Sequence, residues 1–377
     1  MHYFIYATQD AWISSGSSHV DGTSFTDQNV GQDEILELKK TFWNKAFDYQ
    51  TRVLVSFAGS EFTEVSQSIH NGDIVNPKFN LRLYEAEGTQ DLTTEYKLAA
   101  FPVSESWEEG VGKFGDNPKV TNGASWDNIN YYPGNSAITW SQAGGGVRQN
   151  EQGGTVITGS GNEVSQSFSY ESPDINMDVT DIVNNWLGGT NKNYGFLLRF
   201  SGSQETDNTT FGQLKFFSKQ TNTIYSPKLE VKWDDHKPCT GSNTGSLLQM
   251  TSSGEVDYTL YMKGLKESYK ENDKIKFRVM PRKRYIQKTF STSAQTVTGS
   301  YIPEGSGSYS IVDLATGETT VPFSSYTSMS CDPTSNYFIQ WMNTFQPNRA
   351  YKIVYRIKYI DGQEILYDDG FEFNVRS

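Results

Sequence analysis

The chain has 377 residues, with 32 Lys and Arg against 44 Asp and Glu, so its net charge is −12 when the histidines are neutral. This length indicates two or three domains at roughly 100–200 residues each, and an aromatic content of 14% excludes a disordered chain. No stretch approaches the roughly 18–20 apolar residues of a membrane-spanning helix, and Met1–Asp10 lacks the parts of a secretory signal. We expect a folded protein that is made in a reducing cytoplasm and contacts no membrane.

The charge is distributed unevenly. Residues 1–238 contain 17 basic and 30 acidic residues, whereas residues 239–377 contain 15 basic and 14 acidic residues. The acidic first part would repel a phosphate backbone, so we expect no nucleic-acid partner.

Most periodic segments before residue 234 alternate between apolar and polar side chains. Each predicts a strand with one buried face; these segments are 34–39, 52–57, 79–84, 194–200, 214–217 and 228–233. The one convincing helix covers 178–187 and ends at Gly188 and Gly189. Together with turns rich in Gly, Asn and Ser, this pattern predicts an all-β sandwich.

A polar, breaker-rich stretch follows the last of these strands. We expect a linker over 236–254 that proteases cleave first, with one domain over 1–235 and a second over 255–377. In the second domain, segment 350–359 is apolar or aromatic at odd positions and mostly cationic at even ones, which predicts another half-buried strand.

A tyrosine-corner spacing precedes that strand. The positions of Phe345, Pro347 and Tyr351 match the spacing by which fibronectin-type sandwiches place a tyrosine whose hydroxyl bonds to upstream backbone. The second domain is therefore predicted to be an immunoglobulin-like or fibronectin-like β-sandwich.

The cysteines and histidines form no catalytic or metal-binding pattern. Cys239 and Cys331 are too far apart in sequence for a metal site, and a reducing cytoplasm predicts two free thiols. The four histidines lack spacings such as His-x-His, and no serine lies in a Gly-x-Ser-x-Gly elbow.

One acidic cluster has two interpretations. Glu105, Glu108 and Glu109 flank Trp107, and one interpretation is a glycosidase acid beside an aromatic sugar platform. The simpler interpretation, which we prefer, is a buried tryptophan with solvated carboxylates around it. We therefore predict that the chain is not an enzyme.

Acidic loop residues are the candidates for a metal site. Asp21, Asp27, Asp33 and Glu34 could supply oxygen ligands to a structural calcium ion if the fold brought them together. No other cofactor is predicted.

A basic stretch over 274–288 carries seven cations. Alternate positions place cations on one face of a strand and Ile275, Phe277 and Val279 on the buried face. Nucleic-acid binding and a solvated edge strand are alternatives, but docking onto an acidic protein surface is preferred because the first half of the chain is acidic. The candidate docking residues are Lys274, Lys276, Arg278, Arg282, Lys283 and Arg284.

The motifs of the first 235 residues follow the order of a known family. They are Asp10–Ile13, Arg52–Phe57, Leu81–Tyr84, Val103–Gly110, Asp178–Trp186, Tyr194–Leu198 and Pro227–Val231. In this order they resemble the DNRLRE domain, a jelly-roll-like β-sandwich related to carbohydrate-binding modules. The resemblance implies a jelly-roll-like first domain and leaves its activity open.

A narrower resemblance concerns origin. Gly112–Trp126 looks like an insertion in virion proteins of marine T-even-type tailed phages, and Tyr309–Asp313, Val321–Phe323, Asn336–Phe338 and Tyr351–Ile353 are similar to segments of their structural proteins. This resemblance implies a non-catalytic virion protein of the neck or collar, tail or fibre-attachment region. Such a protein would be made in the host cytoplasm and would dock onto other virion proteins in a symmetric assembly.

Two other functions remain as alternatives. A carbohydrate-binding adhesin would recognise host-surface glycans through the stacking faces of Trp126, Tyr131, Tyr132 and Trp140, although these aromatics could equally be core residues or loop anchors. A polysaccharide-degrading enzyme would need a catalytic constellation that the sequence does not reveal.

Overall fold

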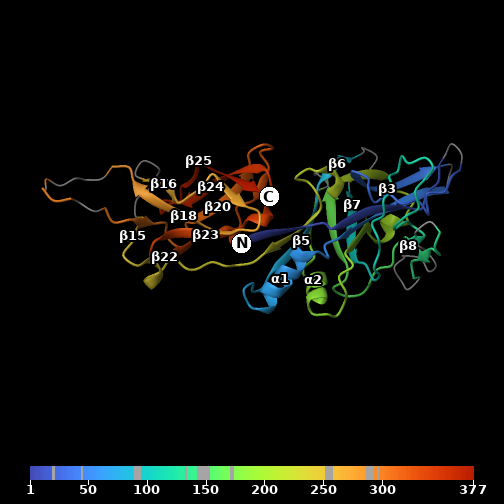
Figure 1. Cartoon of the computed structure of the whole chain (residues 1–377), viewed down its shortest axis with the longest axis horizontal. Coiled ribbons are helices and arrows are strands. Elements are labelled where there is room, and N and C mark those ends of the chain that lie inside the picture. Colours follow the sequence, from blue (N-terminus) through green and yellow to red (C-terminus); the bar gives the residue numbers. More distant parts are fainter. Residues whose placement is uncertain are drawn as a thin grey trace. The chain divides into compact units, whose positions relative to one another are not determined.

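The computed structural model describes residues 1–18, 22–43, 46–88, 95–131, 134–141, 153–169, 174–250, 258–285, 290, 292–294 and 297–377. The chain divides into two compact units, whose elements are labelled in Figure 1. The jelly-roll unit comprises Ile5–Asp73 and Lys78–Val231, and the immunoglobulin unit comprises Met1–Phe4, Ile74–Pro77 and Lys232–Ser377. With 44% strand and 11% helix, the predicted all-β sandwich class is confirmed.

Among the described residues, the jelly-roll unit has two large sheets and a two-stranded sheet formed by β8 and β9. One large sheet has the strand order β1-β14-β5-β11, and the other has the order β10-β7-β12-β4-β3-β13-β6 with β2 paired to β4. Its strands are β1 His2–Tyr6, β2 Gln9–Ser14, β3 Ile35–Trp43, β4 Ala46–Ser56, β5 Lys78–Leu83, β6 Glu85–Gly88, β7 Glu95–Pro102, β8 Asn128–Asn130, β9 Ile138–Thr139, β10 Val164–Ser169, β11 Ile175–Asp178, β12 Phe196–Phe200, β13 Gly212–Phe217 and β14 Lys228–Lys232. Strand β1 begins, and β14 ends, with residues of the immunoglobulin unit.

Alternation of side chains explains these strands. In β5, Phe79, Leu81 and Leu83 are buried, whereas the polar residues between them are half-buried. All six segments predicted as strands before residue 234 overlap strands of the structure, namely β3, β4, β5, β12, β13 and β14. Each such apolar face stabilises the sandwich by removing its side chains from water.

Two α-helices are found in the described part of the chain. The predicted helix is confirmed as α2, Thr180–Leu187, which buries Ile182, Val183 and Trp186. The second helix, α1, Ser60–His70, was not predicted, because its sequence is mostly polar and only Val65 is buried. Within the described residues, neither helix has the length and apolar character needed to cross a membrane.

The immunoglobulin unit also contains two packed sheets. They have the strand orders β16-β18-β23-β22 and β17-β25-β24-β20-β21, which correspond to the A-B-E-D and A′-G-F-C-C′ arrangement of immunoglobulin-like sandwiches. Its strands are β15 Leu248–Gln249, β16 Tyr258–Lys263, β17 Ser268–Lys270, β18 Lys274–Lys283, β19 Ser300–Tyr301, β20 Gly307–Asp313, β21 Thr319–Val321, β22 Ser330–Asp332, β23 Ser335–Trp341, β24 Arg349–Lys358 and β25 Glu364–Arg376.

The predicted strand and its tyrosine corner are both confirmed. Strand β24 buries Tyr351, Ile353, Tyr355 and Ile357 at odd positions. The Tyr351 hydroxyl accepts a hydrogen bond from the backbone N–H of Gln346 at 3.1 Å. This bond fixes the chain at the entry to β24, as in fibronectin-type domains.

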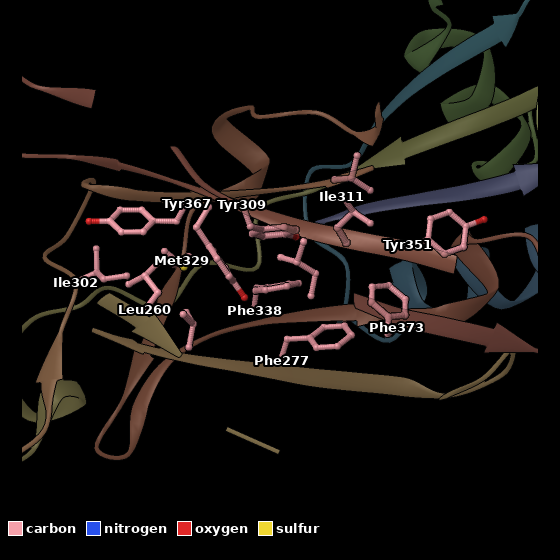
Figure 2. Packing of buried hydrophobic residues seen from close by; sticks show 14 of the residues in the cluster. Leu260, Phe277, Ile302, Tyr309, Ile311, Met329, Phe338, Tyr351, Tyr367 and Phe373 are labelled. Atoms are coloured by element: carbon pink, nitrogen blue, oxygen red, sulfur yellow. The ribbon is translucent and has the colours of Figure 1, made fainter. Parts of the chain in front are cut away.

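Aromatic rings from both sheets fill the core of the immunoglobulin unit (Figure 2). The ring of Phe338 stacks on Tyr309 with centroids 3.8 Å apart and on Phe277 at 5.1 Å. Phe277 also lies 5.3 Å from Phe373 of the opposite sheet. Burying one such ring contributes about 1.5–3 kcal/mol, so Phe277 holds β18 with this face inward.

The prediction of two free thiols is wrong, because Cys239 and Cys331 form a disulfide. They are 92 residues apart in sequence, but their Cα atoms lie 4.8 Å apart. The fold brings them together by bonding the chain after Trp233 to β22, where Lys237 N–H donates to Ser330 Oγ at 3.0 Å. The stretch expected to be a linker thus contains residues bonded to the immunoglobulin unit, while residues 251–254 lie outside the described part.

Replacing both Cys239 and Cys331 with serine should lower the free energy of unfolding of the immunoglobulin unit by about 2–4 kcal/mol. The physical reason is that the bond joins residues 92 positions apart and so restricts the unfolded chain. Urea denaturation followed by tryptophan fluorescence measures this loss. Thiol titration of the denatured, unreduced protein should find no free thiol; two thiols would contradict the disulfide.

Candidate docking surface

The predicted alternation along β18 is confirmed. Phe277 and Val279 are buried, and Ile275 is half-buried against the same core. The opposite face carries Lys274, Lys276, Arg278, Met280 and Arg282. The six candidate docking cations therefore lie on this strand or directly after it.

The first cations of β18 interact with side chains of their own unit. Lys274 Nζ lies 4.9 Å from the ring centroid of Trp341, and Lys276 Nζ lies 4.1 Å from that of Tyr337. Both rings belong to β23, the neighbouring strand. These contacts are cation–π interactions, which hold the ammonium groups close to the sheet.

Arg278 forms the strongest pair on this face. Its guanidinium lies 2.8 Å from the carboxylate of Asp332, and Lys276 Nζ lies 3.6 Å from the same group. Burial alone would raise the pKa of Asp332, but hydrogen bonds, first of all from Arg278, lower it to about 2. The charges of Arg278 and Lys276 are thus partly neutralised within the unit.

The end of β18 is different. Arg282, Lys283 and Arg284 are exposed, and no described carboxylate forms an ion pair with any of the three. The Nε–H of Arg284 donates to the backbone carbonyl of Tyr258 at 3.2 Å. Of the six candidates, these three retain the most available charge.

An apolar groove lies beside these cations. We define it by Leu248, Tyr261, Arg282, Lys283, Tyr285 and Val297, which line a hollow of about 770 Å³. Leu248 is 59% exposed, Val297 60% and Tyr285 80%. No carboxylate is among its described lining residues. Contiguous exposed apolar surface of this kind is typical of interaction sites.

Close backbone packing forms one wall of the groove. Strands β15 and β19 pair in parallel, with Leu248 opposite Ser300. A Cβ atom at Gly299 would lie 2.8 Å from Met280 Cε, so the chain passes close over the Met280 side chain of β18 there. The hydroxyl of Tyr261 contacts Met280 Sδ at 3.2 Å, which fixes the opposite wall.

A second exposed patch lies on the jelly-roll unit and was not predicted as a docking surface, although Asp33 and Glu34 were candidates for a calcium site. It combines an exposed apolar residue, Phe114 at 44% exposure, with carboxylates. We call it the acidic patch and define it by Asp33, Glu34, Glu37, Glu87, Phe114 and Asp116. Phe114 and several of these acids border a hollow of about 440 Å³.

The buried amide of Asn29 positions the loop that carries Phe114. Its Nδ2 donates to the carbonyls of Glu109 and Ala124 at 2.7 and 2.8 Å. Its Oδ1 accepts from the N–H groups of Gly112 at 2.9 Å and Gly31 at 3.3 Å. Because all its hydrogen-bonding groups are used, this side chain ties both ends of the loop to one point.

The glycan-stacking candidates are placed mostly inside the unit. Trp126 and Trp140 are buried; the guanidinium of Arg52 lies 4.7 Å from the Trp126 ring, and the Trp140 Nε1–H donates to a backbone carbonyl. Tyr131 is half-buried, and Tyr132 lies outside the described residues. The two tryptophans therefore present no open face on which a sugar could stack.

In the acidic cluster around Trp107, Glu109 forms hydrogen bonds and an ion pair with residues distant in sequence. Trp107 is buried, as expected, but Glu109 is not the solvated carboxylate that the sequence suggested. Glu109 accepts from the Asp10 backbone N–H at 3.1 Å and from Gln220 at 3.3 Å, and it pairs with Lys219 Nζ at 3.0 Å. Through these bonds the Glu109 carboxylate joins the segments that carry Asp10, Lys219 and Gln220.

The calcium candidates have other partners. Asp27 pairs with Lys119 at 2.5 Å, Glu34 pairs with a lysine, and Asp33 accepts two N–H hydrogen bonds. Asp21 lies outside the described residues. In the described part of the chain, no three His, Cys, Asp or Glu residues gather as a metal-binding group.

Comparison with known proteins adds no functional assignment: no family model matches the chain, and the search of curated proteins found no match. The resemblance to DNRLRE domains and to phage structural proteins therefore stays a prediction. The functional argument rests on the groove, the acidic patch and the cations described above.

Replacing Asp10 with asparagine should reduce the pH dependence of stability. Burial raises the pKa of Asp10 to about 7, opposed by a hydrogen bond from Lys219 N–H and increased by Glu109. The unfolded pKa is about 3.9, so between about pH 4 and 7 the native state binds more protons, and the free energy of unfolding falls as the pH rises.

Thermal melting of the wild type should therefore show a melting temperature that decreases more steeply from about pH 5 to pH 8 than that of the Asp10→Asn variant. Exposed Asp73 provides the control, since Asp73→Asn should leave the slope of the wild type unchanged. Parallel slopes for wild type and Asp10→Asn would contradict the prediction.

Proposed function

We propose that the chain is a non-catalytic structural protein of a tailed-phage virion, in the neck or collar, tail or fibre-attachment region. It acts by docking its immunoglobulin unit onto other virion proteins. The proposal combines the sequence resemblance with one observation, the apolar groove flanked by Arg282 and Lys283.

The groove supports docking through the chemistry of its residues. Tyr and Arg are enriched among the residues that contribute most to protein–protein affinity, and here Tyr285 and Arg282 lie together on an exposed surface. The cations would steer an acidic partner toward the groove and disfavour a basic one. The apolar side chains would then lose water on contact, which favours binding.

The other functions have less support. A glycan-binding adhesin would need exposed aromatic faces, and Trp126 and Trp140 are buried. A polysaccharide-degrading enzyme would need an open pair of acids, whereas Glu109 is bonded to Lys219 and Gln220. Binding to nucleic acid would use the cations of β18, two of which already pair with Asp332.

Mass spectrometry of purified virions tests the proposal directly. The chain should be present at a fixed copy number relative to the major capsid protein. Its absence from particles, or polysaccharide cleavage by the purified protein, would refute the proposal.

Reversing the charges of Arg282 and Lys283 to glutamate should reduce incorporation into particles by about tenfold or more, because removal of close interfacial charge pairs costs about 2–5 kcal/mol. Quantitative mass spectrometry of particles assembled with each variant measures incorporation. The matched control is Lys266→Glu with Lys270→Glu, two exposed cations of the same unit outside the groove. Wild-type incorporation of a folded Arg282→Glu, Lys283→Glu variant would place the docking surface elsewhere.

The earlier cations of β18 are a poorer choice for this test. Glutamate at position 278 would face Asp332, which is now 2.8 Å from the Arg278 guanidinium. Two like charges at that distance would destabilise the sheet. Loss of incorporation could then reflect loss of folding, whereas Arg282 and Lys283 have no described ion-pair partner to lose.

A further inference from the structure

We propose that the apolar groove of one copy binds the acidic patch of a second copy, so that the chain associates with itself head to tail. This inference rests on the proposed function, because a ring or tube in a virion requires a contact repeated between identical copies. The argument comes from the composition of the two surfaces and from the charges of the two units.

The two surfaces are complementary in charge. The groove has Arg282 and Lys283 and no described carboxylate. The acidic patch has five carboxylates. Lys113 pairs with Glu34 at 2.5 Å and Lys215 pairs with Glu87 at 2.6 Å, and the charge of Lys39 also acts on Glu37. The patch therefore keeps an excess of negative charge that the groove can balance.

The two surfaces also share apolar character. Leu248, Tyr285 and Val297 are more than half exposed on the groove, and Phe114 is an exposed aromatic residue of the patch. An interface needs a central apolar or aromatic contact surrounded by polar groups. Phe114 is held at a defined place by the Asn29 bonds, so it can serve as that contact without a large cost of ordering.

The charges of the whole units disfavour the other pairings. The jelly-roll unit contains 15 Lys and Arg against 28 Asp and Glu, whereas the immunoglobulin unit contains 17 against 16. Two jelly-roll units brought together would repel each other, and two immunoglobulin units would lack a charge difference to orient them. A contact between unlike units is heterologous, and such contacts form rings when the rotation closes.

Sedimentation velocity of the full chain tests self-association. Over about 1–100 µM, the weight-average mass should increase with concentration at about 50 mM salt and decrease toward the monomer at about 500 mM, where charges are screened. A mass that stays monomeric across this range at low salt would overturn the inference. Groove and patch docking within one copy would give that same monomeric result, so it too counts against the proposal.

A charge-swap experiment tests the two surfaces themselves. One variant carries Arg282→Glu and Lys283→Glu, and the other carries Glu34→Lys and Glu87→Lys, all at exposed positions. Each alone should remain monomeric because its groove and patch then have charges of the same sign. Mixing the two variants should restore association, since every groove then meets a patch of opposite charge.

Three controls make the outcome decisive. Circular dichroism and thermal melting show that each variant is folded, and the Lys266→Glu, Lys270→Glu control should associate like the wild type. Wild-type association by either charge variant alone, or a mixture that stays monomeric, would overturn the inference. Failure here is distinguishable from failure of the proposed function: a monomeric chain found in virions refutes only self-association, and an associating chain absent from virions refutes only the virion role.

Discussion

The alternation of buried and exposed side chains along β18 determines which of its residues pack in the core of the immunoglobulin unit and which place positive charge on its surface. Phe277 packs between Phe338 and Phe373, so the strand cannot shift by one residue without turning its cations into the core. With that face fixed, Lys276 and Arg278 lie against Tyr337 and Asp332 of neighbouring strands. Beyond Val279, β18 pairs with β16 and no longer with β23. Arg282 and Lys283 have no described ion-pair partner there, and the apolar groove lies beside them.

The immunoglobulin unit is assembled from distant parts of the chain. The Met1 ammonium donates to the carbonyls of Trp233 at 2.6 Å and Tyr326 at 2.7 Å, and Gln340 Nε2 donates to the carbonyl of His2 at 2.9 Å. Burial lowers the pKa of this ammonium group, while Asp235 raises it. These bonds join the N-terminal residues to the rest of the unit, and the disulfide joins Cys239 to Cys331.

Local patterns were sufficient to predict the strands whose side chains alternate clearly, among them β5 and β24. The period of two that predicts β5 and β24 depends only on neighbouring residues, and the Tyr351 corner depends on a spacing of a few positions. The disulfide, the burial of Trp126 and the bonds of Glu109 depend instead on which loops the fold brings together. Helix α1 was missed for a related reason, since its polar sequence contains few apolar residues to mark a buried face.

Only the cationic part of the candidate docking surface could be predicted from local sequence patterns. The cationic face of β18 follows from alternation, but the groove requires β15 and the chain around Gly299 to pack over Met280. Exposure of Leu248 and Val297 cannot be deduced from sequence, because isolated apolar residues in polar stretches are as often buried under loops. The clearest signal available was the tyrosine that follows three cations, Tyr285.

The acidity of the jelly-roll unit lies mainly on its surface. Among the described residues of the unit, Lys40, Arg52, Arg199 and Lys228 are buried, and Arg52 pairs with Glu205 at 2.8 Å. Buried cations of this kind are used in the core and do not offset the exposed carboxylates. At physiological salt, screening limits repulsion between copies to about 8 Å, so copies held close together need a contact that matches charge at short range. The chain carries a surface of each kind, one on each unit, and the proposed head-to-tail contact would take its direction from this asymmetry.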